Sequence, residues 1–574
     1  MGSRQNTPNG CAELSGHNQT TERFLSNNIE TAVLIVGAGP VGLTLALDLA
    51  WRGIEVVVVE IRGHGVPPPA KCNHVSARTM EVYRRLGISQ KIRATGLPAD
   101  YPNDVAFRTT FTGIEIARIP IPCRRDRYTT TEGPDTGWPT PEPPHRINQI
   151  YLEPILFEQA AATAEISIHC RSRFIALEQS DNGVVAVIED LDTGNTHPIF
   201  CEYLIGCDGG SSAVRKSIGS QFHGDSVLQR CQSSFIRTAE LIHLQNEKPA
   251  WSTISLNPRR SGNVYAIDGQ SLWIIHNYLR EDESDFESVD RDSSIRTILG
   301  VDDEFKYDIL AREDWFGRRL VADRFRKNRV FLCGDAAHIW VPYAGYGMNA
   351  GVADAANLSW LLSATLNQWA PESILDAYER ERLPITEQVS HFVMNHTHAM
   401  VKQRRTVPGN IEALGQEGNR VRQQTGRDAY ELNVQQYCAA GLNFGYFYDD
   451  SPIIAHEPEP PPAYTMSTFT ASTLPGCRLP HLYLESGCSL YDRLGPEFTL
   501  LRLDPGLDVT VLTAAATHRC CPLHILDITV PPDNSEYTHP LILVRPDQHV
   551  AWRGHTCPID GLSLIDQIRG CTPA

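Results

Sequence analysis

The segment Thr31-Ala-Val-Leu-Ile-Val-Gly-Ala-Gly-Pro-Val-Gly42 reads as a buried strand that runs directly into a glycine-rich turn. An apolar helical stretch follows over residues 43–50, and Val56-Val-Val-Val59 forms a second strand that ends in Glu60. A strand, a GxGxxG turn, a helix and a second strand with an acidic end make up the βαβ dinucleotide-binding fingerprint. Because all four parts occur in order, the sequence predicts a nucleotide site rather than a chance glycine turn.

Each glycine of this turn has its own task in the fingerprint. Gly37 makes the tight turn, Gly39 lets the backbone approach a pyrophosphate, and Gly42 allows the helix to pack closely on the strand. The helix N-terminus adds unpaired N–H groups and a partial positive charge. Glu60 follows the glycines by about 20 residues, where an acidic side chain accepts from a free ribose 2′-hydroxyl. The pattern favours FAD or NAD and does not choose between them.

The composition sets outer limits on function. The chain has 574 residues, enough for two or three domains, and its 41% hydrophobic content is typical of globular proteins. A formal charge of −17 argues against nucleic acid or an anionic membrane as partner. The 15 cysteines form no C-x-x-C, so neither a disulfide framework nor a metal site is expected. Residues 1–30 are polar and no apolar run reaches membrane-spanning length, which predicts a disordered tail and a cytoplasmic protein.

Two further strand-to-helix turns carry an aspartate. Cys207-Asp-Gly-Gly-Ser-Ser-Ala-Val-Arg215 closes one strand, and its Asp208, small residues and Arg215 suit a ribose or pyrophosphate site. The alternative is a capped helix, with Ser211 or Ser212 as N-cap. Gly334-Asp-Ala-Ala-His338 follows another strand, so Asp335 is placed to accept from a ribitol or ribose hydroxyl. Pro342-Tyr-Ala-Gly-Tyr-Gly-Met-Asn-Ala-Gly351 then puts a glycine-rich turn directly before a helix. Such a turn offers backbone amides to electron density on a bound ring.

These segments, at 37–42, 208–215 and 334–351, resemble in their order the class A flavoprotein monooxygenases, the para-hydroxybenzoate and phenol hydroxylase group. The resemblance covers residues 31–400. It implies an α/β fold in which a Rossmann-like FAD domain is interleaved with a β-sheet substrate domain. It also implies FAD as cofactor and NAD(P)H as co-substrate, bound without a second Rossmann domain.

The last hundred residues carry a fainter resemblance, to the thioredoxin-like tail of the larger phenol hydroxylases. The similar stretches are Ser489-Leu-Tyr-Asp-Arg-Leu-Gly495 and residues 541–552. Without C-x-x-C, redox activity there is not expected, and the tail is interpreted as structural or as a contact in a homodimer. The expected organisation is a tail, 1–30; an FAD-binding domain, 31–105, 149–220 and 325–400; a substrate-binding β-sheet domain, 106–148 and 221–324; a helical segment, 401–456; a proline-rich linker, 457–463; and a thioredoxin-like domain, 464–574.

The family resemblance assigns FAD contacts along the chain. They are Gly37, Gly39, Gly42 and Glu60 for the ADP half; Asp335 for the ribityl-pyrophosphate region; Gly347, Met348 and Asn349 beside the isoalloxazine; and Arg78 and Gln149 as further contacts. Asp208 falls in a segment that the family uses for both FAD and NAD(P)H. Two positions depart from the family pattern, because Tyr346 replaces a frequent Gln and Leu361 replaces a frequent Lys. These departures leave the ring contacts open.

A predicted strand over residues 271–278 supplies candidates for a substrate pocket. Trp273 shares one face of this strand with residues 271 and 275, whereas His276 and Tyr278 share the other. The candidate lining residues are Tyr265, Trp273, Trp340, Pro342 and Tyr343, with core packing as the alternative for each. His276 and Tyr278 are the candidate catalytic groups, because either side chain can polarise a phenol.

The expected chemistry follows from the cofactor. Triplet dioxygen reacts slowly with closed-shell molecules, so a cofactor must carry the electrons. In the family, reduced flavin gives a C4a-hydroperoxide whose distal oxygen attacks an electron-rich carbon. The resemblance therefore implies a monooxygenase that uses O2 on a phenolic or polyketide-like aromatic small molecule, in secondary metabolism.

Four alternatives stay open at this point. Baeyer–Villiger oxidation or epoxidation uses the same chemistry on ketones or alkenes, and a flavin oxidase or dehydrogenase would consume oxygen without inserting it. A non-catalytic flavin-binding scaffold is disfavoured by three intact flavin segments. A membrane-associated quinone-pathway hydroxylase is disfavoured by the polar ends and the acidic balance.

Overall fold

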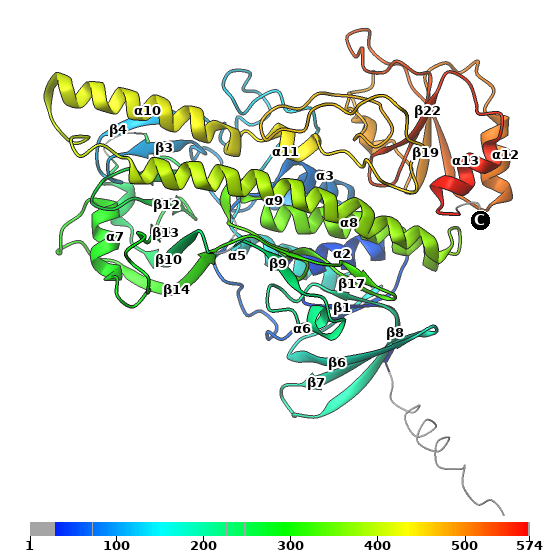
Figure 1. Ribbon diagram of the computed structural model, residues 1–574, viewed down its shortest axis with the longest axis horizontal. Helices are drawn as coiled ribbons and strands as arrows, with labels where there is room; N and C mark the ends of the chain where they lie inside the picture. The colour runs from blue at the N-terminus through cyan, green and yellow to red at the C-terminus, as the bar shows by residue number, and fades with distance from the viewer. Residues whose placement is uncertain (1–28, 72, 226, 246–247, 486, 572–574) are drawn as a thin grey trace, which may run out of the picture.

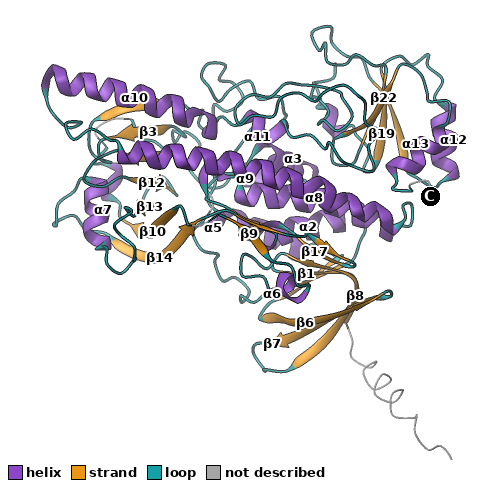
Figure 2. Cartoon of the chain, in the orientation of Figure 1, coloured by secondary structure: helices purple, strands orange, loops and turns teal. Residues whose placement is uncertain are grey.

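The computed structural model describes residues 29–71, 73–225, 227–245, 248–485 and 487–571 (Figure 1). Two large sheets lie at different levels beside a group of long helices, and a smaller sheet stands at the C-terminal end of the molecule (Figures 1 and 2). The predicted N-terminal tail lies outside the described residues, except for Ile29 and Glu30, which open the first strand.

The first sheet has eight strands, with a main order of β16-β17-β8-β1-β2-β5 and an arm made of β6 and β7. Its strands are β1 Ile29–Val36, β2 Val56–Val59, β5 Ile166–His169, β6 Ser172–Ser180, β7 Gly183–Asp190, β8 Thr196–Gly206, β16 Arg326–Lys327 and β17 Val330–Leu332. β1 pairs in parallel with both β2 and β8. Helices cover the faces of such a parallel centre, which is why β2 is an unbroken run of buried valines.

The helices around this sheet position the predicted nucleotide turn. They are α2 Pro40–Trp51, α3 Ala77–Arg85, α4 Ser89–Arg93, α5 Gln149–Ala161, α6 Ala213–Ser217 and α8 Gly347–Leu366. α2 packs between α5 and α8, so the segments near residues 40, 150 and 350 meet at one edge. The carboxyl ends of β1, β8 and β17 point to that same edge, where ligands of parallel sheets bind.

The second sheet has seven strands in the order β14-β10-β13-β12-β11-β3-β4. Their bounds are β3 Val105–Arg108, β4 Glu115–Ile119, β10 Gln229–Arg237, β11 Ser252–Ser255, β12 Gly262–Ala266, β13 Leu272–Tyr278 and β14 Asp308–Gly317. β3 pairs in parallel with β11, so an early segment of the chain completes a sheet built from a much later one. Helix α7, Arg291–Leu299, covers one face through Ile295 and Ile298. This interleaving confirms the predicted fold class.

Long helices and a small sheet join the two large sheets. β9 Phe222–Gly224, β15 Leu320–Ala322 and β18 His338–Ile339 form a three-stranded sheet. α9 Asp376–Arg405 runs across both large sheets, α10 Gly415–Tyr437 packs on β4, and α11 Ala440–Phe444 follows (Figure 1). Within the described ranges, no helix combines the length and the apolar character that a membrane span requires.

The C-terminal sheet is a compact mixed unit. Its elements are β19 Phe498–Arg502, α12 Thr510–His518, β20 Leu523–Asp527, β21 Leu541–Val544, β22 Val550–Gly554 and α13 Gly561–Ile568. The spatial order is β20-β19-β21-β22, with β19 and β20 parallel and the other neighbours antiparallel. This β-α-β-β-β-α arrangement agrees with the expected thioredoxin-like domain.

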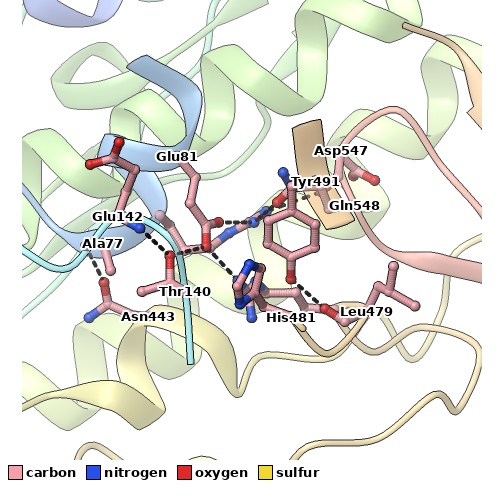
Figure 3. Close-up of polar contacts among 12 residues, drawn as sticks. Ala77, Glu81, Thr140, Glu142, Asn443, Leu479, His481, Tyr491, Asp547 and Gln548 are labelled. Carbon is pink, nitrogen blue, oxygen red and sulfur yellow. Dashed lines mark hydrogen bonds and ion pairs between the residues drawn. The ribbon is translucent and has the colours of Figure 1, made fainter. Parts of the chain in front are cut away.

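A buried ionic network joins this domain to α3 (Figure 3). Glu81 of α3 accepts from Arg478, from Arg78 at 2.7 Å and from the Thr140 hydroxyl at 2.7 Å. Burial alone would raise the pKa of the Glu81 carboxyl, but Arg478 and Arg78 outweigh it and the pKa is lowered. Arg78 also donates to Gln548 and to the Asp547 carbonyl oxygen. The Glu81 carboxylate is paired with the guanidinium groups of Arg78 and Arg478, so these charged groups can be buried.

A second buried network fixes the same domain to α9. Arg545 of the C-terminal domain donates to both oxygens of Glu381, at 2.6 and 2.8 Å, and also pairs with Asp547 at 2.7 Å. Ser451 and Asn357 complete the hydrogen bonds of the Glu381 carboxylate. Arg545 and Glu381 are almost fully buried, so removing one partner would strand a charge in the interior.

We expect Arg545→Met to destabilise the protein by about 3–5 kcal/mol, because Glu381 would lose its bidentate partner in a buried site. The measurement is the urea concentration at the midpoint of unfolding. Arg502→Met is the matched control, since Arg502 pairs with the partly exposed Asp527 on the surface of the same domain. An equal shift of the midpoint in both variants would contradict a special role of the Glu381 network.

Candidate functional site

A cavity of about 530 Å³ lies where the carboxyl edge of the first sheet meets the second sheet. One part of its wall comes from the first sheet and its turns: Gly39, Pro40, Val41, Arg62, Gln149, Cys207, Gly209, Cys333, Asp335, Gly347 and Met348. The other part is aromatic: Trp251, Tyr265, His276, Tyr278, Trp315, Trp340, Tyr343 and Tyr437. The cavity thus joins a glycine-rich polar end to an aromatic end.

The three glycines of the first turn have the geometry that the fingerprint requires. Gly37 has a φ of +108°, and a Cβ there would lie 2.4 Å from the Cys207 carbonyl oxygen. A Cβ on Gly42 would lie 2.0 Å from the Gly37 carbonyl oxygen, so only glycine lets α2 approach β1 this closely. A Cβ on Gly39 would meet no atom within 4 Å, because this position faces the cavity. There is therefore free space next to Gly39, the position at which the fingerprint lets the backbone approach a pyrophosphate.

Glu60 lies at the end of β2 beside this turn. Its Oε2 accepts from the Ala38 backbone N–H at 2.6 Å, and its Oε1 accepts from Arg62 at 2.8 Å. Arg62 also pairs with Glu153 at 2.5 Å, and the Gln149 amide donates to Glu153 at 2.9 Å. Arg62, Gln149 and Glu153 all line the cavity, so β2 and the start of α5 present a connected polar edge to it.

Asp335 lies in the turn after β17, and its carboxylate opens into the cavity. The protein around it displaces water and raises the pKa of the carboxyl above its ordinary value. The turn is held from behind by Asp354, which accepts from the Gly334 N–H, from His338 at 2.7 Å and from Arg382 at 2.9 Å. His338 is thus held in place by Asp354, and the Asp335 carboxylate is left facing the cavity.

The N-terminus of α8 forms the next part of the wall. Gly347 and Met348, which the resemblance places beside the isoalloxazine, line the cavity. Asn349 does not, because its side chain fastens the segment before α3. Its Oδ1 accepts from the Ser76 N–H and the Thr79 hydroxyl, each at 2.8 Å, and its Nδ2 donates to the His74 carbonyl oxygen at 3.1 Å. Asn349 thus positions the site and lies outside the cavity lining.

Two predicted contacts are placed away from the cavity. Arg78 extends toward the C-terminal domain, where Glu81 and Gln548 bind its guanidinium group. Asp208 turns back onto α6 and accepts from the Ala213 and Val214 N–H groups at 2.7 and 3.2 Å. Neither belongs to the cavity lining: Arg78 contacts the C-terminal domain, and Asp208 accepts hydrogen bonds at the start of α6, whose N-cap is Ser212.

The two departures from the family pattern have simple structural settings. The Tyr346 hydroxyl donates to the Leu442 carbonyl oxygen at 2.5 Å, and its ring is buried outside the cavity lining. Leu361 is fully buried in the core beneath α8, where a lysine would have to leave its charge without water. Both residues stabilise packing around α8.

At the aromatic end the side chains contact one another ring to ring. His276 lies 5.4 Å from Tyr265, 6.3 Å from Tyr278 and 5.8 Å from Trp315, measured between ring centroids. Burial lowers the pKa of His276 to about 4 and raises the pKa of Tyr265 to about 12. Burial likewise raises the pKa of Tyr278. With these pKa values, His276, Tyr265 and Tyr278 are uncharged at neutral pH.

The alternation predicted for β13 is present, with one correction to the list of pocket residues. Ile274, His276 and Tyr278 face the cavity, together with Tyr265 of β12. Trp273 points the other way, is buried against Phe111 and donates its indole N–H to the Thr238 carbonyl oxygen at 3.1 Å. Trp273 is therefore a core residue. Trp340, Pro342 and Tyr343 line the cavity as expected.

Several lining residues carry no local signal in the sequence. Trp251, Trp315 and Tyr437 come from the start of β11, the end of β14 and the end of α10, which meet only in the folded chain. Arg146 and Lys71 also line the cavity. Arg146 occurs three residues before Gln149 in a proline-rich segment. The sequence of this segment does not predict the direction of the Arg146 side chain.

Models of two protein families match this chain. The FAD binding domain matches residues 30–393, and the aromatic-ring hydroxylase C-terminal domain matches residues 472–567. The FAD-dependent monooxygenase apdD of Emericella nidulans is 29% identical over 554 residues, which cover 91% of this chain and 87% of that protein. Tetracenomycin B2 monooxygenase-dioxygenase of Streptomyces olivaceus is 28% identical over 575 residues, 94% of this chain and 98% of that protein.

Solved structures agree with these relatives. The rebeccamycin biosynthetic enzyme RebC with reduced flavin has a TM-score of 0.86 at 32% identity and covers 95% of this chain and 100% of its own. Aklavinone-11 hydroxylase with FAD and aklavinone has a TM-score of 0.78 at 25% identity, covering 94% and 99%. The chain therefore belongs to the family that carries this FAD-binding domain, and it is an FAD-dependent monooxygenase similar to the class A aromatic hydroxylases.

Proposed function

We propose that the protein uses NAD(P)H and O2 to insert one oxygen atom into a phenolic or polyketide-like aromatic small molecule. The observation that carries the proposal is a single cavity with a dinucleotide turn at one end and a wall of aromatic rings at the other. Similar proteins support the substrate class, since their names include a putative polyketide hydroxylase, a phenol 2-monooxygenase and an aklavinone-11 hydroxylase.

The residues around the cavity fit FAD. Gly39 and the N-terminus of α2 would hold the pyrophosphate, and Glu60 and Arg62 would serve the adenosine ribose. Asp335 would accept from the ribityl chain, and Gly347 at the start of α8 would stabilise negative charge on the ring. We take Arg62 and Gln149 as the FAD-contacting pair in place of Arg78 and Gln149. Bound FAD supplies the electron transfer to dioxygen that the side chains themselves cannot perform.

The chain's own part in the reaction is to orient the aromatic substrate and to exclude water from it. The rings of Tyr265, Trp315 and Tyr343 offer flat apolar surfaces for stacking. His276 is neutral at pH 7 because burial lowers its pKa to about 4, so it can accept a hydrogen bond from a substrate hydroxyl without a change of charge. The Tyr278 hydroxyl stays protonated at pH 7, because burial raises its pKa, and it can donate a hydrogen bond. Each acts on the orientation and polarity of the substrate hydroxyl.

We expect Gly39→Val to lower the affinity for FAD by roughly 100-fold, because a side chain would occupy the pyrophosphate position and block two or more charge-assisted hydrogen bonds. Equilibrium dialysis of FAD against the apoprotein measures this. Gly409→Val is the matched control, since a Cβ at either glycine meets no atom within 4 Å and Gly409 lies outside the cavity. Unchanged FAD affinity in Gly39→Val would exclude this turn as the phosphate site.

The reaction is tested by mass spectrometry under 18O2 with FAD-loaded protein, NADPH or NADH, and a panel of hydroxynaphthalenes and hydroxyanthraquinones. We expect at least one of them to accelerate NAD(P)H oxidation and to gain one 18O atom. Fragmentation of the product then separates ring hydroxylation from Baeyer–Villiger oxidation or epoxidation, which add the same mass. Stoichiometric hydrogen peroxide with every compound, and no labelled product, would identify an oxidase instead.

His276→Leu should slow product formation at least tenfold, because the substrate hydroxyl would lose its acceptor. Reduction of the flavin by NAD(P)H should change little. With a pKa of about 4, His276 should add no inflection to the pH dependence of turnover between pH 6 and 8. An inflection in that range that disappears in His276→Leu would show that the imidazole titrates there and would contradict this role.

A further inference from the structure

The charged side chains that line the cavity are paired, with two exceptions. Arg62 pairs with Glu153 at 2.5 Å, and Lys71 pairs with Glu313 at 2.5 Å. Asp335 is the acidic exception and belongs to the turn assigned to the ribityl chain. The basic exception is Arg146, which has no carboxylate within 4.0 Å in the part of the chain that the structure describes. The described residues therefore supply no ion-pair partner for the positive charge of Arg146.

Arg146 is held firmly at the aromatic end of the cavity. Its guanidinium carbon lies 4.5 Å from the centroid of the Trp251 ring, and one of its nitrogens donates to Nδ1 of His74. Trp251 in turn contacts Tyr265 at 5.4 Å and Tyr437 at 6.2 Å, both of which line the cavity. The ring contacts and the single hydrogen bond fix the plane of the guanidinium group. They leave its other N–H groups without a partner among the described residues.

The nearest acidic influence on Arg146 is already engaged. Asp135 acts on Arg146 only at a distance, and its carboxylate pairs with Arg127 at 2.6 Å. The Arg127 cation in turn disfavours the positive charge on Arg146. Arg146 is only 5% exposed, and its burial lowers the pKa of the guanidinium group. Burying a charge without a counter-charge is unfavourable, so an anion bound at this point would stabilise the folded protein.

We propose that Arg146 binds a carboxylate of the substrate, so that the natural substrate is an aromatic or polyketide-derived acid. This inference rests on the proposed function, because it places the substrate rings against Trp251, Tyr265 and His276. A planar guanidinium group matches a carboxylate with two parallel hydrogen bonds, and desolvation by the surrounding rings strengthens both. Arg146 therefore selects substrates by charge, whereas the aromatic wall selects them by shape.

The experiment measures how tightly the FAD-loaded protein binds two probes of equal shape, 1-hydroxy-2-naphthoate and its neutral amide 1-hydroxy-2-naphthamide, by isothermal titration calorimetry. We expect the carboxylate to bind at least about tenfold more tightly than the amide, and Arg146→Met to abolish this difference. Lys71→Met is the matched control, because it removes a cavity cation that Glu313 already neutralises. It should retain the preference.

Two results would overturn the inference. One is equal affinity for both probes, or no binding of the carboxylate, in the unmodified protein. The other is a carboxylate preference that persists in Arg146→Met or is lost equally in Lys71→Met. FAD content and thermal unfolding confirm that each variant is folded, and Arg146→Gln replaces Arg146→Met if the latter does not retain FAD. Incorporation of 18O is scored separately, so a monooxygenase without a charge preference remains distinguishable from a protein that inserts no oxygen.

Discussion

The close approach of three backbone segments at Gly37, Gly42 and Cys207 is the constraint on which the rest of the structure depends. A single extra carbon on Gly42 would stand 2.0 Å from the Gly37 carbonyl oxygen, and one on Gly37 would stand 2.4 Å from that of Cys207. Without these contacts α2 could not lie against β1 and β8 at their carboxyl ends. Those ends supply the polar half of the cavity, and the second sheet closes it with the aromatic half.

Local patterns were enough to predict the parts of the site whose geometry is local. The strand, turn and helix around Gly39, the turn that carries Asp335 and the alternation along β13 each depend on a few consecutive residues with a fixed period or a special φ. The structure brings these parts to one cavity. The same reasoning predicted the α/β class, because each of the three turns joins a strand to a following helix, as in a parallel sheet.

Residues whose role is set by distant partners could not be assigned in this way. Arg78 follows a helix start that resembles the family pattern, yet its direction is decided by the C-terminal domain that carries Gln548. Asn349 is adjacent to two lining residues but satisfies the backbone before α3. Arg146 and Tyr437 enter the cavity from a loop and from the end of α10, which become neighbours only after both sheets have packed. The positions of these side chains are determined by long-range packing rather than by local propensity.

Helix α9 links the C-terminal domain with the aromatic end of the cavity. It has 30 residues, so it is about 45 Å long. Near one end, Glu381 is locked to Arg545 of the C-terminal domain, and near the other, the Arg404 guanidinium group lies 4.1 Å from the centre of the Tyr278 ring. Side-chain contacts therefore hold α9 near both of its ends. Tyr278 takes its position in β13 from pairing with Cys231 of β10, and the Arg404 contact adds a link from the aromatic wall to the C-terminal domain that does not pass through the first sheet.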